Sequence, residues 1–123
     1  MASIIVITGD QKGDYYPLGQ RTSVIGRDEA LPIQILDELV SRKHMKISFD
    51  KDKKQYYVVD MDSKHGVFIN DVKIRKETVL SDNDFITIGR TSLFFTLKDF
   101  DNRENALLHF KKAGERIRPT HIE

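Results

Sequence analysis

The sequence contains no cysteine, which excludes disulfides, thiolate metal ligands and a cysteine nucleophile together. It also lacks an excess of either charge, because 20 Lys and Arg face 19 Asp and Glu and give a net charge of +1. This balance argues against binding of nucleic acid or an anionic membrane through bulk electrostatics. Any cationic site must therefore be local. The absence of cysteine fits a reducing compartment, and we expect a cytoplasmic protein.

The sequence has no apolar run long enough to span a membrane. The run at residues 4–7 is short and has no basic region before it, so we interpret it as a first strand and not as a signal peptide. With 123 residues, 39% of them hydrophobic and 32% charged, the chain fits a single folded domain. Its histidines are too scattered in sequence to suggest a metal site, and nothing indicates a cofactor. They are His44, His65, His109 and His121.

Short β-branched and aromatic segments follow one another closely over most of the chain. The predicted strands are residues 3–8, 15–19, 22–27, 33–35, 45–49, 55–60, 67–69, 72–74, 78–80, 84–88 and 92–97. Their spacing and the turn residues between them indicate an antiparallel β-sandwich or barrel, not alternating strands and helices. Asn70-Asp71 predicts a two-residue turn, because both residues tolerate positive φ.

The character of the sequence changes after residue 97. Residues 101–114 begin with a capping Asp, carry Glu104 in the first turn and end in lysines and Gly. This pattern predicts one C-terminal helix. We therefore divide the chain into a domain at 1–99, a helix at 100–114 and a flexible tail at 115–123.

Thr120 lies in the predicted tail, in a basic, proline-flanked setting that a kinase could reach. A phosphorylated Thr120 would be able to dock on this domain's own Arg27 surface or on a second copy, giving an inhibited state or a homodimer. The alternative is an unmodified tail, which is the commoner state for such a segment.

Three polar clusters lie between predicted strands: Gly26-Arg27, residues 41–44 and residues 63–66. Polar clusters collect where strands end and loops begin, so these three are expected at the rim of the sandwich. Arg27 offers a planar fork of donors and Ser41 a short hydroxyl donor, both suited to a doubly charged oxyanion. The clusters therefore predict a phosphate-recognition surface.

These clusters resemble those of the forkhead-associated (FHA) domain, a phosphothreonine-peptide-binding module. The resemblance extends over about residues 3–98. Its matching residues are Gly26-Arg27, Ser41-Arg42-Lys43-His44, Asp60, Ser63, Gly66, Phe68-Ile69-Asn70, Val72, Ile74 and Gly89. The resemblance implies an all-β, FHA-like (SMAD/FHA) antiparallel sandwich of about eleven strands, whose loops at one end hold the peptide.

The resemblance also implies roles for single residues. Arg27 and Ser41 contact the phosphate, Arg42 assists, and His44 braces the binding loop. The remaining members of the motif, Gly26, Gly66 and Asn70, support the site structurally.

The third cluster departs from the family pattern. FHA domains usually have Asn before its glycine, where the amide holds the backbone of the bound peptide, and here that residue is His65. Val67 replaces the usual Thr, and Asp71 the usual Gly. An imidazole cannot copy an amide's adjacent donor and acceptor, so peptide binding would be weakened, shifted in register or made sensitive to pH. Lys64 offers an additional charge for the phosphate or an acidic peptide residue.

Three functions fit these observations. The first is recognition of a phosphothreonine-containing protein, a Ser/Thr kinase or its substrate, without enzymatic activity and without nucleic acid or membrane. The second is a phosphate-independent scaffold or dimerisation domain of the same fold, which the His65 replacement leaves open. The third is hydrolysis by Ser41, His44 and Asp60 or Asp62. No Gly-x-Ser-x-Gly elbow surrounds Ser41, which argues against hydrolysis.

Overall fold

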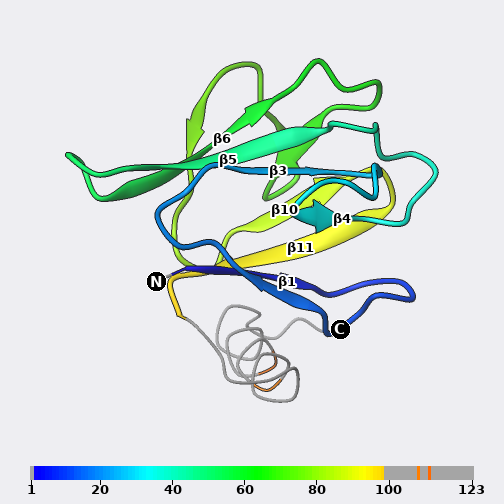
Figure 1. Cartoon of the computed structure of the whole chain (residues 1–123), viewed down its shortest axis with the longest axis horizontal. Helices are drawn as coiled ribbons and strands as arrows, with labels where there is room; N and C mark the ends of the chain where they lie inside the picture. The colour runs from blue at the N-terminus through cyan, green and yellow to red at the C-terminus, as the bar shows by residue number, and fades with distance from the viewer. Residues whose placement is uncertain (1, 99–107, 109–110, 112–123) are drawn as a thin grey trace.

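Two sheets of short strands face each other in the computed structural model, which describes residues 2–98, 108 and 111 (Figure 1). Six strands have the order β2-β1-β11-β10-β7-β8, and five have the order β4-β3-β5-β6-β9. The strands are β1 (Ser3–Val6), β2 (Tyr15–Pro17), β3 (Ser23–Gly26), β4 (Ile33–Gln34), β5 (Met45–Asp50), β6 (Gln55–Asp60), β7 (Val67–Ile69), β8 (Val72–Lys73), β9 (Thr78–Val79), β10 (Phe85–Ile88) and β11 (Thr91–Thr96). The predicted all-β antiparallel sandwich is confirmed, with β3 and β4 as a parallel pair within it.

The core lies between the sheets and is built from alternating strand residues. Met45 and Ile47 of β5 are buried, and Lys46 between them is not. The ring of Tyr56 from β6 lies 4.8 Å from that of Phe49 and 5.6 Å from that of Phe95 in the opposite sheet. In β5 the period of two that predicted the strand therefore also sets which side chains are buried. In β1 all four residues are buried, and Ile5 belongs with Phe94 to a second, smaller cluster.

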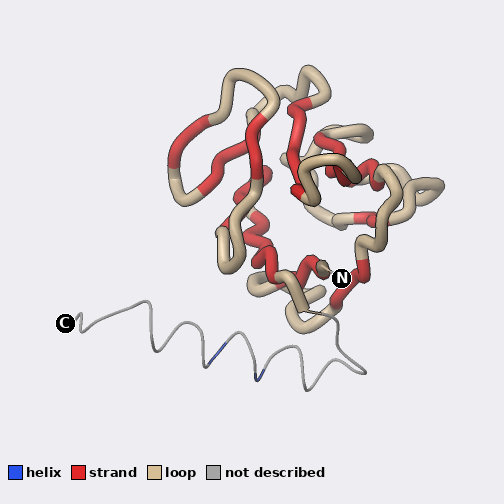
Figure 2. Tube along the Cα trace, turned by 90° about the vertical axis from the view of Figure 1, so that its left-hand side faces the viewer, coloured by secondary structure: helices blue, strands red, loops and turns tan. Residues whose placement is uncertain are grey.

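The strands at 55–60 and 67–69 match the prediction, and the others differ from it by one or two residues at their ends. Figure 2 shows how short the strands are beside the loops that join them. The predicted helix at 100–114 and the tail with Thr120 lie outside the described part of the chain, apart from residues 108 and 111. Within that described part, no helix is long and apolar enough to cross a membrane.

Several loops meet at one end of the sandwich, on the right in Figure 1. The pairings Ile25–Met45 and Met45–Asp60 place the end of β3, the start of β5 and the end of β6 side by side. The pairing of Val67 with Ile88 places the start of β7 beside the end of β10. We call this region the loop end and define it as residues 27–32, 35–44, 61–66 and 89–90.

The β7–β8 turn lies at the other end of β7. Asn70 and Asp71 have φ values of 50° and 69°, as the two-residue turn requires. The Asn70 amide donates from Nδ2 to Asp84 Oδ1 at 2.9 Å, and its Oδ1 accepts from the Phe85 N–H at 2.9 Å. Asn70 therefore supports the predicted two-residue turn, which lies at the end of β7 away from the loop end.

Asp71→Gly is expected to raise the free energy of unfolding by about 0.5 kcal/mol, because glycine adopts a left-handed conformation without the Cβ clash. Thermal or urea unfolding measures the change. Asn70→Gly is the matched comparison and should lower stability by about 1–2 kcal/mol, because it removes two hydrogen bonds. Equal effects of the two substitutions would contradict this account of the turn.

Candidate functional site

Gly26 lets two loops approach each other more closely than any other residue would allow. A Cβ at this position would lie 2.1 Å from the carbonyl oxygen of Arg42 and 2.8 Å from that of Ser41. The contact continues as the Arg27 N–H donates to the Ser41 carbonyl at 3.0 Å, and the Asp28 N–H to the Arg42 carbonyl at 3.3 Å. The first two predicted clusters, 15 positions apart in sequence, thus form one surface.

The Arg27 side chain is exposed and held at one point. Its Nε donates to the Val40 carbonyl at 3.0 Å, which lays the guanidinium over the loop between β4 and β5. Within the described residues, the two terminal nitrogens form no hydrogen bond and no ion pair. They remain available for the oxygens of an anion.

His44 connects the second and third clusters. The imidazole is completely buried; its Nδ1 accepts the Ser41 N–H at 3.0 Å, and its Nε2 lies 2.7 Å from the Gly66 carbonyl. A neutral ring protonated on Nε2 satisfies both contacts, with Nε2–H donating to Gly66. His44 therefore braces the loop that carries Ser41 against the loop between β6 and β7.

The loop between β6 and β7 is ordered by its own polar residues. Asp60 Oδ1 accepts the Ser63 N–H at 3.0 Å, and Ser63 Oγ accepts the Gly66 N–H at 2.9 Å. The Ser41 hydroxyl oxygen accepts the Lys64 N–H at 3.1 Å. Because this contact uses a lone pair, the hydroxyl proton of Ser41 can still be donated to a ligand.

The same contacts argue against hydrolysis by Ser41, His44 and Asp60. The Ser41 atom that meets His44 is the backbone nitrogen, while its hydroxyl lies against Lys64. Both ring nitrogens of His44 are already engaged, and Asp60 contacts Ser63 instead of the imidazole. These residues do not form a serine nucleophile, base and acid relay.

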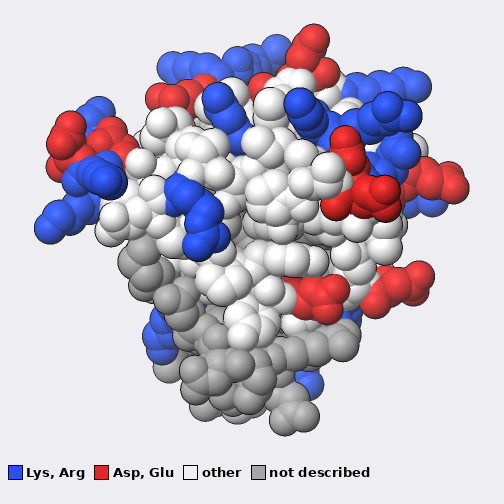
Figure 3. Space-filling model, in the orientation of Figure 1, with Lys and Arg blue, Asp and Glu red and all other residues white. Residues whose placement is uncertain are grey.

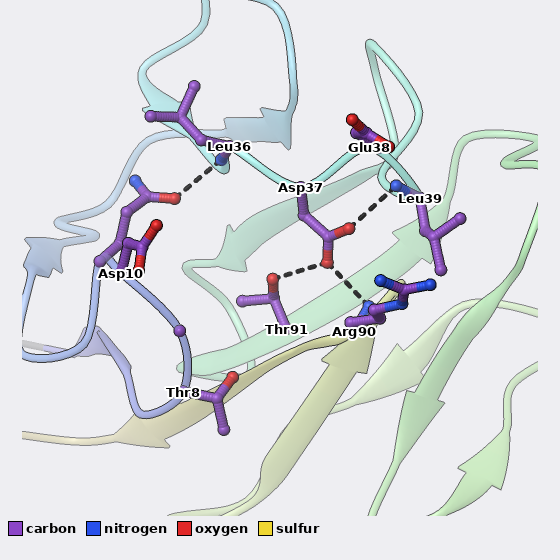
Figure 4. A pocket seen from close by; sticks show the side chains of 10 residues that line it. Thr8, Asp10, Leu36, Asp37, Glu38, Leu39, Arg90 and Thr91 are labelled. Carbon is purple, nitrogen blue, oxygen red and sulfur yellow. Dashed lines mark hydrogen bonds between the residues drawn. The ribbon is translucent and has the colours of Figure 1, made fainter.

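Asp37 is a structural residue of the loop end that the sequence did not reveal. Its carboxylate accepts the Leu39 N–H at 2.9 Å, the Arg90 N–H at 2.7 Å and the Thr91 hydroxyl at 2.8 Å (Figure 4). Burial opposes ionisation of Asp37, but these three donors and the charge of Arg90 outweigh it and lower its pKa below 3.8. Asp37 thereby fastens the β4–β5 loop to the β10–β11 turn.

Asp37→Asn is expected to lower the free energy of unfolding by about 1–3 kcal/mol at neutral pH, because an amide cannot accept three such bonds at full charge. A carboxylate whose folded pKa is depressed contributes stability above its unfolded pKa and loses it as pH falls through the folded pKa. Urea unfolding between neutral pH and about pH 3 should therefore bring the two proteins closer together. A difference that stays constant with pH would contradict this role.

The exposed residues of the predicted site lie around these braced loops. Arg42, Lys64 and His65 are all exposed to solvent. Lys73 of β8, which the sequence did not indicate, lies against Gly66: a Cβ there would be 2.9 Å from Lys73 Cε. Lys and Arg side chains gather at the upper right of the surface in Figure 3, over this end of the molecule.

The described residues contain no group of three or more His, Asp or Glu that could hold a metal ion. A hollow of about 360 Å³ does lie beside Asp37, between the β1–β2 loop and the β10–β11 turn (Figure 4). Its lining includes Asp10, Leu36, Glu38 and Arg90. Its mixed polar and apolar walls indicate no particular ligand.

Comparison with known proteins agrees with this geometry. Residues 23–89 match the FHA domain family model. The oxoglutarate dehydrogenase inhibitor of Corynebacterium jeikeium is 35% identical over 94 residues, which cover 76% of this chain and 63% of the inhibitor. The glycogen accumulation regulator GarA of Mycolicibacterium smegmatis is 31% identical over 107 residues, covering 85% of this chain and 66% of GarA. The chain thus spans just under two thirds of the length of both relatives.

A solved structure also superposes on this fold. Mycobacterium tuberculosis EmbR in complex with a low affinity phosphopeptide superposes with a TM-score of 0.71 at 28% identity, over 82% of this chain and 25% of EmbR. The family match covers more than half of the chain and includes Arg27, Ser41, His44 and Gly66. The chain therefore belongs to the FHA domain family of phosphothreonine-dependent protein-recognition modules.

Proposed function

We propose that this chain binds phosphothreonine-containing segments of partner proteins at its loop end, and that a Ser/Thr kinase or a kinase substrate supplies them. The main support is one contact: the Arg27 N–H donates to the Ser41 carbonyl at 3.0 Å, so both predicted phosphate ligands belong to one surface. The site takes part in signalling in the cytoplasm.

The chemistry of the two groups favours phosphate over a bare hydroxyl. A phosphothreonine carries a charge of about −1.5 to −2 near neutral pH and three strong acceptor oxygens. The terminal nitrogens of Arg27 can pair with two of these oxygens, and the Ser41 hydroxyl can donate to a third. An unmodified threonine has neither the charge nor the three phosphate oxygens. The site should therefore distinguish phosphorylated from unphosphorylated threonine through these groups of the ligand.

Arg42 and Lys64 add positive charge beside Arg27 and Ser41, the two residues that we call the phosphate grip. Both side chains are exposed, and neither pairs with a carboxylate among the described residues. Exposed charges at a rim raise association rates and set partner preference more than they raise affinity. His65, also exposed, occupies the position from which the family holds the peptide backbone.

A binding role without catalysis is favoured by the same contacts. Among the described residues, no general base contacts the Ser41 hydroxyl, and two of the relatives named above are an inhibitor and a regulator. We extend that regulatory character to this chain.

Paired titrations test the proposal. A degenerate phosphothreonine peptide pool selects the best binder, which is then titrated by calorimetry beside its unphosphorylated form. Arg27→Ala should weaken the phosphopeptide about 10- to 150-fold, because a charged hydrogen-bond partner is removed. Arg21→Ala, at the opposite end of the sandwich, is the control and should change nothing. Equal affinity for both peptides would overturn the proposal in favour of a phosphate-independent scaffold.

His65→Asn is expected to raise phosphopeptide affinity about fivefold, because an amide presents a donor and an acceptor to the peptide backbone together. The gain should appear in the same calorimetric titration, with the melting temperature unchanged since the side chain is exposed. A lower affinity would mean that the imidazole itself contacts the peptide, and an unchanged affinity would contradict a peptide contact at this position.

A further inference from the structure

Lys73 reaches the loop between β6 and β7 from a neighbouring strand. Against the bare Cα of Gly66, a Cβ would lie 2.9 Å from Lys73 Cε and 3.6 Å from Nζ. The glycine thus leaves room for the lysine stem, and the ammonium lies beside the loop that carries Lys64 and His65. An edge strand thereby adds a cation to the recognition surface.

The charge on this side of the loop is not balanced. Lys64 and Lys73 are exposed, and neither has a carboxylate within ion-pair distance among the described residues. Farther along, Arg75 and Lys76 line a hollow together with Asp60 and Asp62. Arg75 and Lys76 thus share that hollow with two carboxylates, whereas Lys64 and Lys73 have no carboxylate within ion-pair distance among the described residues.

These two lysines lie within reach of a peptide held at the phosphate grip. The Lys64 N–H contacts the Ser41 hydroxyl, so the loop starts at the grip itself. Gly66 follows two residues later, at most about 7 Å away between Cα atoms. An extended peptide advances about 3.3 Å per residue, so side chains within roughly four positions of the phosphothreonine can reach Lys73.

We propose that Lys73, together with Lys64, forms a subsite for an anionic side chain near the phosphothreonine. The inference rests on the proposed function, because the phosphate anchors the peptide that presents this side chain. Its ligand is a carboxylate of Asp or Glu, or a second phosphate, on the same peptide. The chain would then prefer sites made by kinases that phosphorylate threonines in acidic surroundings.

Matched peptides test the subsite. Three peptides carry one central phosphothreonine: one is flanked by alanines, one has Glu at positions two to four on the N-terminal side, and one has Glu at the same positions on the C-terminal side. Wild type should bind one acidic peptide about two- to fivefold more tightly than the alanine peptide, as expected for exposed charge pairs. A phosphoserine replacing one Glu distinguishes a preference for phosphate from one for carboxylate.

Lys73→Met should remove that preference and leave the affinity for the alanine-flanked peptide unchanged. Lys51→Met, in the β5–β6 turn at the other end, is the control and should retain it. Equal affinities of wild type for all three peptides, or an equal loss on all three in Lys73→Met, would overturn the subsite. Failure of the proposed function would give a different result. Wild type would then bind unphosphorylated and phosphorylated peptides equally well, or Arg27→Ala would bind the phosphopeptides as tightly as wild type does.

Discussion

Gly26→Ala is expected to eliminate measurable phosphopeptide binding and to lower the free energy of unfolding by about 3 kcal/mol or more. The added Cβ would lie 2.1 Å from the Arg42 carbonyl oxygen, which is backbone and cannot rotate away. The β4–β5 loop must then move off β3, which breaks the hydrogen bonds from Arg27 and Asp28 to that loop. Arg27 and Ser41 would no longer face the same ligand.

Calorimetry and thermal unfolding measure the two losses. Gly9→Ala is the matched control, because Gly9 has a φ of +77° and a Cβ there would have nothing within 4 Å. That substitution should cost only about 1 kcal/mol of backbone strain and leave binding unchanged. Normal peptide binding by Gly26→Ala would show that the close approach is not needed for the site.

His44→Ala is expected to lower the free energy of unfolding by about 3–5 kcal/mol. Truncation leaves the Ser41 N–H and the Gly66 carbonyl without their partner in a buried place, and it opens a cavity where a fully buried ring was. Phosphopeptide affinity should fall as well, because two loops lose their common brace.

His44→Gln separates the hydrogen bonds from the volume. Its amide offers N–H donors and a carbonyl acceptor and should recover part of both the stability and the affinity. His65→Ala, on the exposed face of the same region, should change stability by less than about 0.5 kcal/mol. Identical losses in His44→Ala and His44→Gln would mean that packing, not the bridging contacts, explains the effect.

Sequence predicted most of the fold because its signals are local. Alternation along β5 and β6, and the Asn70-Asp71 turn, each depend on neighbouring residues, and the structure confirms them. The association of Arg27 with Ser41 was also predicted, since both sit at strand ends of one sheet.

Other contacts between distant segments were beyond prediction. Asp37 meets Arg90 and Thr91 across 53 and 54 positions, and nothing local marks it as different from a solvated loop acid. Gly26 was expected to support the site structurally. Its φ is not positive, and its importance comes from a backbone that packs against it from elsewhere.

The close packing at Gly26 also bears on how this domain can change partners. The framework of the loop end is held by main-chain hydrogen bonds and by the buried His44 side chain, and the side chains at positions 42, 64, 65 and 73 are exposed. These four residues can therefore be substituted without disturbing the backbone of the loop end. A few surface substitutions should then be enough to change which peptide sequences the domain prefers. Because the binding loops are already ordered before a ligand arrives, the part of the entropic penalty that comes from ordering them is met during folding.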